Sequence, residues 1–573
     1  MMRCWWVVTN VVVARRVVPV WEKPTNSTRR VLMSNAAAPQ PKARLSPEGT
    51  SHEVRSLPGL PGDWRGTHYA GMLGSDDATG GRLFYWFFER EGGGVGAPLL
   101  VWLNGGPGCT SMDGLFLENG PFRLRESSRS LDRRRSSWHT VANTLYVDQP
   151  VGTGFSWTAS GAYCRNDACI ARHFVTFLGR FARLYASLVL ASPARSVPIY
   201  FSGESHAGHY VPLLVDALVE DDDGIEWNVR GMALGNAWID PYNQYDASRM
   251  GFALGLISAD ASRTLRSQEK TCQVALDRKQ YMSKACWNLL DDVVRTSGSK
   301  NRDHLKANMY DAREAVRSTA QFPPGHERVE AYMNTPAVRE ALHVDPSAPK
   351  FYECANPPYN ALKHQDGLGI MPVLRKLLDR GEIQVLFYNG QFDLICNHVG
   401  VQRSLLALDW ARAENFRRAP YVPWMRRGGL RPAGHFMEVP GLALLVVADA
   451  GHMVPMNQPE VALDMITNFI TAIERGDSLA AYFTSPQYNA TRHPINGACV
   501  DTCGTFRTPQ PALHKTNATP LSPSRLSFHE GSRHISGPNR GGTHGSSVRH
   551  PVDRRGAHKP GTRRRPIAAP VSS

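Results

Sequence analysis

The chain has 573 residues, 42% of them hydrophobic, and a formal net charge of +14. That charge sits at the ends: residues 1–62 carry +6, residues 504–573 carry +10, and residues 63–503 carry −2. A basic nucleic-acid-binding core is therefore excluded, and nothing in the middle of the chain resembles a nucleic-acid-binding module.

Both ends are predicted to lie outside the folded domain. Residues 1–62 are a leader or disordered basic segment, and their apolar run at 5–14 is cut off by two arginines, as in a poor signal peptide or a transit-like leader. Residues 504–573 are rich in Pro, Ser, Gly and His, which predicts a disordered basic tail. No run of about 18 apolar residues occurs, so we expect no membrane span.

Apolar runs of strand length begin after residue 63, each bounded by Gly, Asn, Asp or Pro. Several are apolar almost throughout, as strands are when both faces of a parallel sheet are covered. In chain order the predicted strands lie at residues 83–89, 98–106, 144–150, 197–203, 230–236, 383–390 and 442–450.

Helical periodicity lies between these strands, at residues 174–188, 210–220 and 459–473. The alternation predicts an α/β fold with a mostly parallel central sheet and flanking helices. Residues 237–340 interrupt it with a polar, mainly helical pattern. We expect a helical insertion, or cap, over the edge of the sheet where ligands bind.

Ser205 lies in the stretch SGESHAGHYVP, between a predicted strand and a predicted helix. A strand–turn–helix of this kind exposes a nucleophile on a tight turn that needs small residues two before and two after the serine. Gly203 and Ala207 meet that need, although the strict Gly-x-Ser-x-Gly pattern has glycine at the second position. Ser205 is therefore a candidate nucleophile.

An acid and then a histidine should follow the serine along the chain on such a sheet. Asp393 comes just after the strand predicted at 383–390, and His452 just after the strand predicted at 442–450. A carboxylate in that place can orient an imidazole and stabilise its charged form. Taken alone, Asp393 is equally well interpreted as a turn cap and His452 as an ordinary loop residue. The order Ser205, Asp393, His452 along the chain nevertheless predicts a catalytic triad.

The stretch WLNGGPGCTS, residues 102–111, follows a predicted strand, and its glycines allow close approach of the backbone. Negative charge that develops on a substrate needs backbone N–H donors, which we expect from Gly106 and from His206. The His206 side chain is adjacent in sequence to Ser205 and therefore too constrained to reach its hydroxyl well.

Seven stretches of the chain form one ordered set of motifs. They are WLNGGPGCTS, ENGPF (118–122), ANTLYVDQPVGTGFS (142–156), GESHAGHYVP (203–212), GNAWID (235–240), FDLICN (392–397) and AGHMVP (450–455). Together they resemble the serine carboxypeptidase family, and the resemblance covers roughly residues 60–500. It implies an α/β-hydrolase fold with 63–503 as the catalytic domain, and release of C-terminal amino acids from peptides at acidic pH through a Ser-Asp-His triad and an acyl-enzyme. It implies peptide or protein C-termini as substrate, and neither a cofactor nor a metal.

The resemblance also implies further site residues, position by position. Cys396 and Met453 would line the pocket for the leaving residue, with Cys396 a free thiol that mercurials attack. Cys109 and Cys354 match positions that are usually bridged. The substrate's C-terminal carboxylate would be recognised by Trp102, Asn104, Gly105, Glu118 and Glu204.

Two ionised carboxylates would repel the carboxylate at a peptide's C-terminus. If Glu118 and Glu204 share a proton, one of them becomes a donor to the substrate, and Asn104 supplies a second donor. Substrate binding should then weaken as pH rises above mildly acidic values. The alternative interpretation makes both glutamates solvated surface acids.

Ten cysteines without zinc-ligand spacing predict disulfides and an oxidising compartment. We expect Cys272 to pair with Cys286 inside the insertion, and we assign no role to Cys164 and Cys169. Sequons predict glycosylation at Asn26, Asn489 and Asn517. The expected location is the secretory pathway, with a vacuolar, lysosomal or secreted enzyme.

Three features depart from the family pattern. His206 replaces the usual Tyr, and Thr110 replaces a usual Ser. The arginine-rich stretch 127–137 predicts a surface loop.

Two other functions compete with the peptidase. A carboxypeptidase-like acyltransferase would use the same scaffold and triad, and a non-catalytic binding protein would use the fold alone. The presence of Asn104, Glu118 and Glu204 favours peptide carboxylates as ligands, and the three triad residues argue against a binding protein.

Overall fold

The computed structural model describes residues 45–483, except 127–129, 223, 299–304, 318–322 and 427–430. The predicted tail and the three sequons lie outside the described residues. Residues 45–62 do not fit the predicted leader, because Val54 and Leu57 are buried in the core of the folded unit. The boundary predicted at residue 62 is therefore too late.

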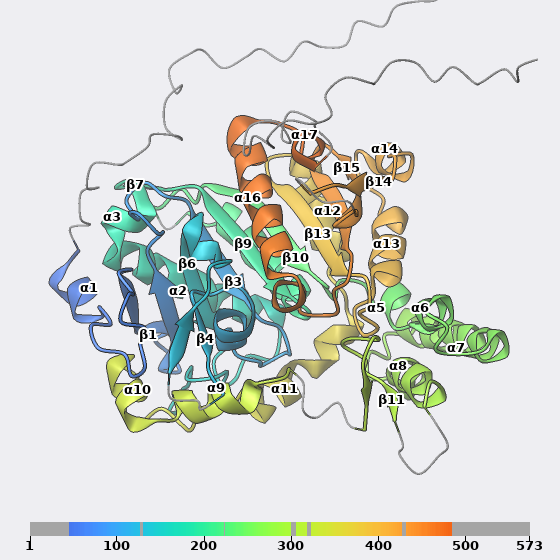
Figure 1. Cartoon of the computed structure of the whole chain (residues 1–573), viewed down its shortest axis with the longest axis horizontal. Helices are drawn as coiled ribbons and strands as arrows, with labels where there is room; N and C mark the ends of the chain where they lie inside the picture. The colour runs from blue at the N-terminus through green and yellow to red at the C-terminus, as the bar shows by residue number, and fades with distance from the viewer. Residues whose placement is uncertain are drawn as a thin grey trace, which may run out of the picture. The chain divides into compact units, whose positions relative to one another are not determined.

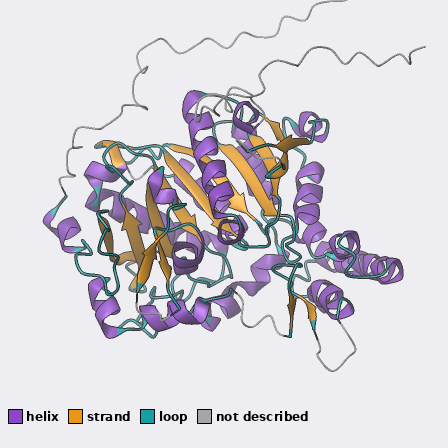
Figure 2. Ribbon diagram, in the orientation of Figure 1, coloured by secondary structure: helices purple, strands orange, loops and turns teal. Residues whose placement is uncertain are grey.

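A ten-stranded sheet crosses the described part of the chain (Figures 1 and 2). The six central strands, from β6 to β16, are parallel neighbours. Beside β6 the sheet continues with β2 and then β1, and beside β16 with β15 and then β14, each antiparallel to the strand before it. The prediction of a mostly parallel sheet is confirmed. In spatial order the strands are β1 (His68–Asp76), β2 (Gly81–Phe88), β6 (Asn143–Asp148), β3 (Leu99–Leu103), β9 (Ile199–Glu204), β10 (Val229–Gly235), β13 (Gln384–Gly390), β16 (Leu442–Val447), β15 (Gly434–Val439) and β14 (Val422–Trp424).

Strand β3 shows how the sheet divides the core into two layers. Leu99, Val101 and Leu103 pack into one apolar cluster, and Leu100 and Trp102, which alternate with them, pack into a second. A strand covered on both faces needs apolar residues at every position, which is why these runs are apolar throughout.

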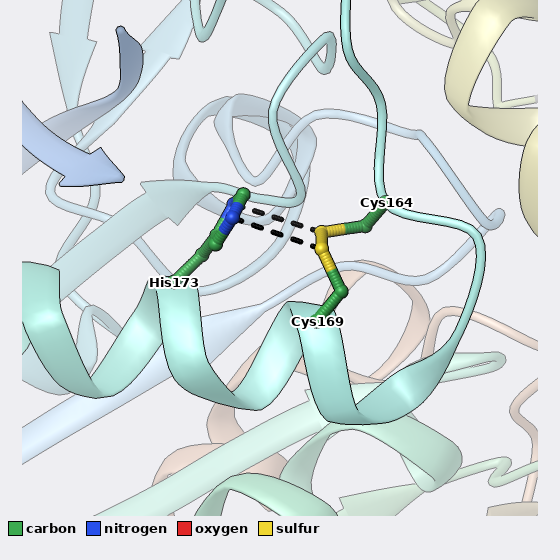
Figure 3. A group of neighbouring side chains, drawn as sticks. All are labelled: Cys164, Cys169 and His173. Carbon is green, nitrogen blue, oxygen red and sulfur yellow. Dashed lines mark hydrogen bonds between the residues drawn. A yellow bond between two sulfur atoms is a disulfide. The ribbon is translucent and has the colours of Figure 1, made fainter. Parts of the chain in front are cut away.

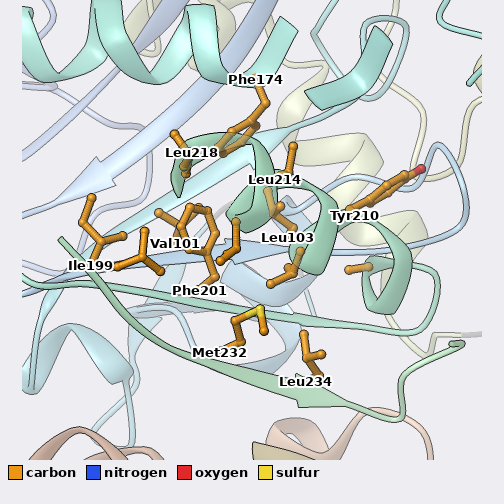
Figure 4. Packing of buried hydrophobic residues seen from close by; sticks show 14 of the residues in the cluster. Val101, Leu103, Phe174, Ile199, Phe201, Tyr210, Leu214, Leu218, Met232 and Leu234 are labelled. Atoms are coloured by element: carbon orange, nitrogen blue, oxygen red, sulfur yellow. The ribbon is translucent and has the colours of Figure 1, made fainter. Parts of the chain in front are cut away.

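Helices lie on both faces of the sheet. Helices α2 (Asp167–Leu184), α4 (Ala207–Val219) and α12 (Met371–Arg380) contribute to the first cluster, and α9 (His326–Met333) and α16 (Pro459–Arg475) to the second. In Figure 4, Phe174 of α2 and Leu214 and Leu218 of α4 pack around side chains of the central strands. Helix α4, which directly follows Ser205, is thus anchored along its length.

The chain between β10 and β13 is mainly helical, and two of its helices, α7 (Ala259–Asp277) and α8 (Lys284–Thr296), contribute to two small apolar clusters of their own. Its buried Glu269 accepts hydrogen bonds from Arg249 at 3.0 Å and from Arg403 of α13 (His398–Ala407) at 2.7 Å, which ties this region to the sheet's flanking helices. Its elements before α9 are α5 (Pro241–Gln244), α6 (Ser248–Ala253), α7, α8, β11 (Lys306–Ala307) and β12 (Ala315–Val316).

Some elements were not predicted. Strands β1 and β15 carry polar residues and glycine among their apolar ones, and β14 has only three residues with Pro423 at its centre, so all three escape the pattern of a buried run. The stretch at 127–137 is not a loop throughout, because Leu131–Arg133 forms β5 against β4 (Phe122–Leu124) and buries Leu131.

No helix among the described residues is long and apolar enough to cross a membrane. The remaining elements are short: α1 (Pro47–Ser51), η1 (Gly114–Glu118), η2 (Trp138–Thr140), α3 (Ala186–Val189), β7 (Leu190–Ser192), β8 (Arg195–Ser196), α10 (Pro336–Ala341), α11 (Asn356–Leu362), η3 (Lys363–Gly367), α14 (Ala413–Arg417), α15 (Val454–Asn457) and α17 (Ala480–Phe483).

Candidate active site

Ser205 occupies the turn between β9 and α4 in a left-handed backbone conformation, with φ of 60°. Its N–H donates to the Gly235 carbonyl at 3.1 Å, and its carbonyl accepts from Gly208 and Trp238, each at 2.9 Å. A side chain at Gly203 would place its Cβ 2.7 Å from that of Ala207. Small residues on both sides therefore allow the sharp turn, which leaves the Ser205 side chain partly exposed between buried neighbours.

Asp393 and His452 meet at the carboxyl ends of β13 and β16. The His452 Nδ1 lies 2.9 Å from Asp393 Oδ2, and both side chains are buried. The N–H groups of Ile395 and Cys396 donate to the same carboxylate at 3.0 and 3.2 Å. An acceptor-only Asp393 that receives this many donors holds the imidazole with Nδ1 as the donor, which leaves Nε2 to act as a base.

Asn236 is a functional residue that the sequence reasoning missed. It follows β10 with a left-handed φ of 41°, and its Nδ2 donates to Asp393 Oδ2 at 2.6 Å. Its Oδ1 accepts from the Gly390 N–H at 3.1 Å. The only available signal was the GNAWID stretch, because asparagine tolerates positive φ at a strand end.

Cys396 and Met453 are buried beside this pair. Cys396 is the free cysteine among the described residues, and its thiol interacts with the Ser205 side chain. Burial, reinforced by the Asp393 charge, raises the pKa of this thiol well above its usual range. Ligand atoms of Asp393, Cys396 and His452 lie within 4.8 Å of one another, so the nucleophile candidate and the acid–imidazole pair share one place.

The glycine turn after β3 packs directly against the Ser205 turn. A Cβ on Gly105 would lie 2.4 Å from the His206 nitrogen and 3.0 Å from the Ser205 Cβ, so no side chain fits. Gly106 has φ of 111°, which favours glycine. Within the described residues, the N–H groups of Gly106 and His206 donate to no protein acceptor. Both are therefore available to a substrate.

The His206 side chain turns away from Ser205. Its Nδ1 lies 2.6 Å from Asp366 Oδ1, and its ring stacks on His209 with centroids 4.8 Å apart. Trp238 donates from Nε1 to the Asp366 carbonyl at 2.9 Å. His206, which stands where the family pattern has tyrosine, thus links η3, the short helix that contains Asp366, to the turn that carries Ser205.

A group of buried polar side chains lies on the other side of the Ser205 turn. Trp102 donates from Nε1 to Asn104 Oδ1 at 2.7 Å, and Asn104 Nδ2 lies 3.0 Å from Glu204 Oε1 and 3.5 Å from Glu118 Oε1. The Oε2 atom of each glutamate has no donor among the described residues. These two oxygen atoms are therefore available for a hydrogen bond between the two carboxyl groups or to a ligand.

The protonation of this pair follows from its burial. Burial raises the pKa of Glu118 to about 7. Burial, together with the neighbouring Glu118 charge and a hydrogen bond between the two groups, raises the pKa of Glu204 well above its usual range. The pair therefore holds a proton at acidic pH, and one carboxyl group can donate a hydrogen bond.

Three disulfides form among the described residues: Cys109–Cys354, Cys272–Cys286 and Cys164–Cys169. The first two are the expected pairings. The third joins the two cysteines to which the sequence assigned no role.

Comparison with known proteins gives consistent matches. A family model described as serine carboxypeptidase matches residues 58–472. The chain is 35% identical over 476 residues to the pheromone-processing carboxypeptidase KEX1 of Phytophthora infestans, and this match covers 81% of this chain and 79% of that protein. It is 34% identical over 438 residues to serine carboxypeptidase S10 family member 2 of Dictyostelium discoideum, with 73% and 75% covered.

A solved structure also matches. The crystal structure of KEX1(delta)P, a prohormone-processing carboxypeptidase from Saccharomyces cerevisiae, superimposes with a TM-score of 0.67 at 26% identity. The match covers 74% of this chain and 96% of that one.

Proposed function

Because this chain belongs to the serine carboxypeptidase family and has the α/β-hydrolase fold, we propose that it removes C-terminal amino acids from peptides at acidic pH through an acyl-enzyme on Ser205. The observation that carries this proposal is the buried hydrogen bond between His452 and Asp393, at strand ends beside a serine on a left-handed turn.

The proposed chemistry has two steps. His452 Nε2 takes the Ser205 proton while Oγ attacks the carbonyl carbon of the last peptide bond; the C–N bond breaks, and His452 protonates the leaving amine. Water then attacks the acyl group with His452 again as base, which frees Ser205. The N–H groups of Gly106 and His206 bind the oxyanion in both steps.

Recognition of a free C-terminus is assigned to the group around Glu204. The protonated carboxyl of the pair formed by Glu118 and Glu204 donates to the substrate carboxylate, and Asn104 is positioned by Trp102 to donate a second bond. Gly105 lets the backbone of this group pack directly against the Ser205 turn, where no side chain fits. Cys396 and Met453 line the pocket of the leaving residue in this proposal.

The shared proton predicts the pH dependence. Burial has raised the pKa of Glu118 to about 7, so as pH rises through that value the pair loses one proton and a negative charge appears beside the substrate carboxylate. We expect KM to rise at least about tenfold between pH 5 and pH 8 while kcat changes less. In Glu204→Gln the amide donates at every pH, so KM should vary by no more than about twofold.

The measurement is kcat and KM against pH for an N-blocked dipeptide. The exposed Glu340→Gln is the matched control and should keep the wild-type profile. If Glu204→Gln retains the acidic optimum, the shared proton does not govern binding.

The decisive test of the function is release of free amino acids from N-blocked dipeptides at about pH 5, where the pair is protonated. A peptidase releases them, whereas a carboxypeptidase-like acyltransferase transfers acyl groups between small molecules and leaves these dipeptides intact. Failure of a fluorophosphonate to label Ser205 would leave only a binding protein.

We also propose a secretory location and peptide precursors as substrates. Two relatives are named for pheromone and prohormone processing, which involves peptides. The three disulfides among the described residues support an oxidising compartment.

A further inference from the structure

The Cys164–Cys169 disulfide lies at the start of α2, with an imidazole against both sulfurs (Figure 3). His173 stands one turn after Cys169 on the same helix face. Its Nδ1 lies 3.6 Å from Cys164 Sγ, and its Nε2 lies 3.7 Å from Cys169 Sγ. Asp76 Oδ2 lies 3.6 Å from the same Nε2.

The two sulfurs differ in their surroundings. Cys164 is buried, whereas Cys169 is partly exposed and so is the sulfur that an outside thiol can reach. Cys169 also sits in the first turn of an 18-residue helix, where Asn166 caps its N–H at 2.9 Å. A helix N-terminus stabilises a thiolate at that position.

The imidazole is suited to move a proton between these sulfurs. Burial lowers the pKa of His173, with Asp76 opposing the shift, so the ring is largely neutral at neutral pH. A neutral imidazole accepts a proton at one nitrogen and donates from the other. Here one nitrogen faces each sulfur.

The crosslink contributes little to holding distant parts of the chain together. Its cysteines are 5 residues apart, against 245 for Cys109–Cys354, so it removes far less entropy from the unfolded chain. A structural role therefore does not account for the arrangement around it.

We propose that Cys164–Cys169 is a thiol–disulfide exchange site for dithiol partners, with His173 as the proton-transfer group. A partner thiol gives its proton to His173 as its sulfur attacks Cys169; the disulfide breaks, and Cys164 leaves with that proton. The partner's second thiol then loses its proton and attacks the partner sulfur that is bonded to Cys169. Cys169 leaves as a thiolate and takes up that proton. The partner is oxidised to a disulfide, and the two cysteines are reduced.

The test is reduction of the folded full chain with dithiothreitol, quenched with N-ethylmaleimide at successive times and read by peptide mass spectrometry. We expect Cys164 and Cys169 to be labelled at least about tenfold faster than the other two pairs. Cys109–Cys354 is the critical control, because Cys354 is exposed. If exposure alone set the rate, this pair would be reduced before Cys164–Cys169. The buried pair Cys272–Cys286 is the slow reference.

His173→Phe keeps a buried ring but removes the nitrogens, and should slow reduction of Cys164–Cys169 at least about tenfold without changing Cys109–Cys354. Asp76→Asn is a milder variant, expected to slow it about threefold, and serves if His173→Phe does not fold. Reduction of Cys164–Cys169 no faster than Cys109–Cys354, or an unchanged rate in the variants, overturns the proposal.

A second, independent observation concerns the segment 308–313, here called the clamp segment, between β11 and β12. Met309 accepts main-chain bonds from Leu394 at 3.0 Å and Ile395 at 3.1 Å, next to Asp393. The Tyr310 carbonyl accepts from the His452 N–H at 2.7 Å. The clamp segment thus binds both loops that meet in the acid–imidazole pair.

Arg313 joins the same two loops through its side chain. Its Nη1 donates to the Asp449 carbonyl at 2.6 Å, and its guanidinium lies over the Phe392 ring at 5.3 Å. Asp311 holds the guanidinium in place with bonds of 2.8 and 2.5 Å. Asp449 lies three residues before His452, and Phe392 one before Asp393.

We infer that Arg313 is a positioning residue that sets the spacing of Asp393 and His452, an inference that rests on the proposed function. Arg313→Ala should lower kcat about 10- to 100-fold with KM within about threefold, because the carboxylate-binding group is untouched. Fluorophosphonate labelling of Ser205 should slow in parallel, and Arg313→Lys should recover part of the rate.

Arg249→Ala is the matched control, because Arg249 is equally exposed, at 33% against 34%, and forms ion pairs in the same region of the chain. It should lower thermal stability without the selective loss of kcat. Equal effects of the two variants on kcat, or none from Arg313→Ala, overturn the inference. A wild-type chain that is not labelled at all refutes the proposed function instead.

Discussion

Ser205→Ala is expected to lose about six orders of magnitude in kcat, because the acyl-enzyme cannot form without its hydroxyl. The loss should be chemical and not structural. Alanine has the same Cβ as serine, so the left-handed φ of 60° costs the variant no more than the wild type. The main-chain bonds of the turn to Gly235, Gly208 and Trp238 need no side chain.

The measurement is amino acid release from a blocked dipeptide, with fluorophosphonate labelling and thermal unfolding in parallel. Ser205→Ala should be unlabelled, should unfold within a few degrees of the wild type, and should still bind a C-terminal carboxylate. The exposed Ser192→Ala on β7 is the control and should behave as wild type. Labelling that persists in Ser205→Ala would show that another residue is the nucleophile.

Asp393→Asn is expected to lose about four orders of magnitude in kcat. All the groups that bond to this carboxylate are donors: Asn236 Nδ2, His452 Nδ1 and the N–H groups of Ile395 and Cys396. An amide in its place turns its own NH2 toward some of these donors, whichever way it faces. One orientation gives His452 the wrong tautomer, and the other keeps the tautomer but removes the charge that stabilises the imidazolium.

The rate of Ser205 labelling should fall together with kcat in Asp393→Asn, while KM changes little. The matched control is Asp260→Asn, an exposed carboxylate in the first turn of α7 that should leave kcat unchanged. A loss of less than about tenfold in Asp393→Asn would mean that the carboxylate does not assist His452.

Much of the fold was predictable from local pattern. The strands β3, β9, β10, β13 and β16 were found because a strand buried on both faces must be apolar at each position. Strands near the two ends of the sheet, such as β1 and β15, lack that pattern and were missed. The end of the leader was misplaced because burial of Val54 and Leu57 depends on packing against distant parts of the chain.

The candidate site divides in the same way. Residues that follow an apolar strand directly, such as Asp393 and His452, could be identified because their position in the sequence places them at the sheet's carboxyl edge. Asn236 and Arg313 could not, because their bonds reach the Asp393 and His452 loops across more than 100 residues of chain.

The sequence by itself determined where the buried strands lie and which side chains stand at their ends, because both depend on residues adjacent along the chain. Only the tertiary structure decided what those side chains touch. It turned His206 to Asp366, 160 residues away, brought Glu118 and Glu204 close enough to share a proton, and laid His173 across a disulfide. Hydrogen bonds and pKa values depend on distances of a few ångströms in space, and those follow only when the whole chain has packed.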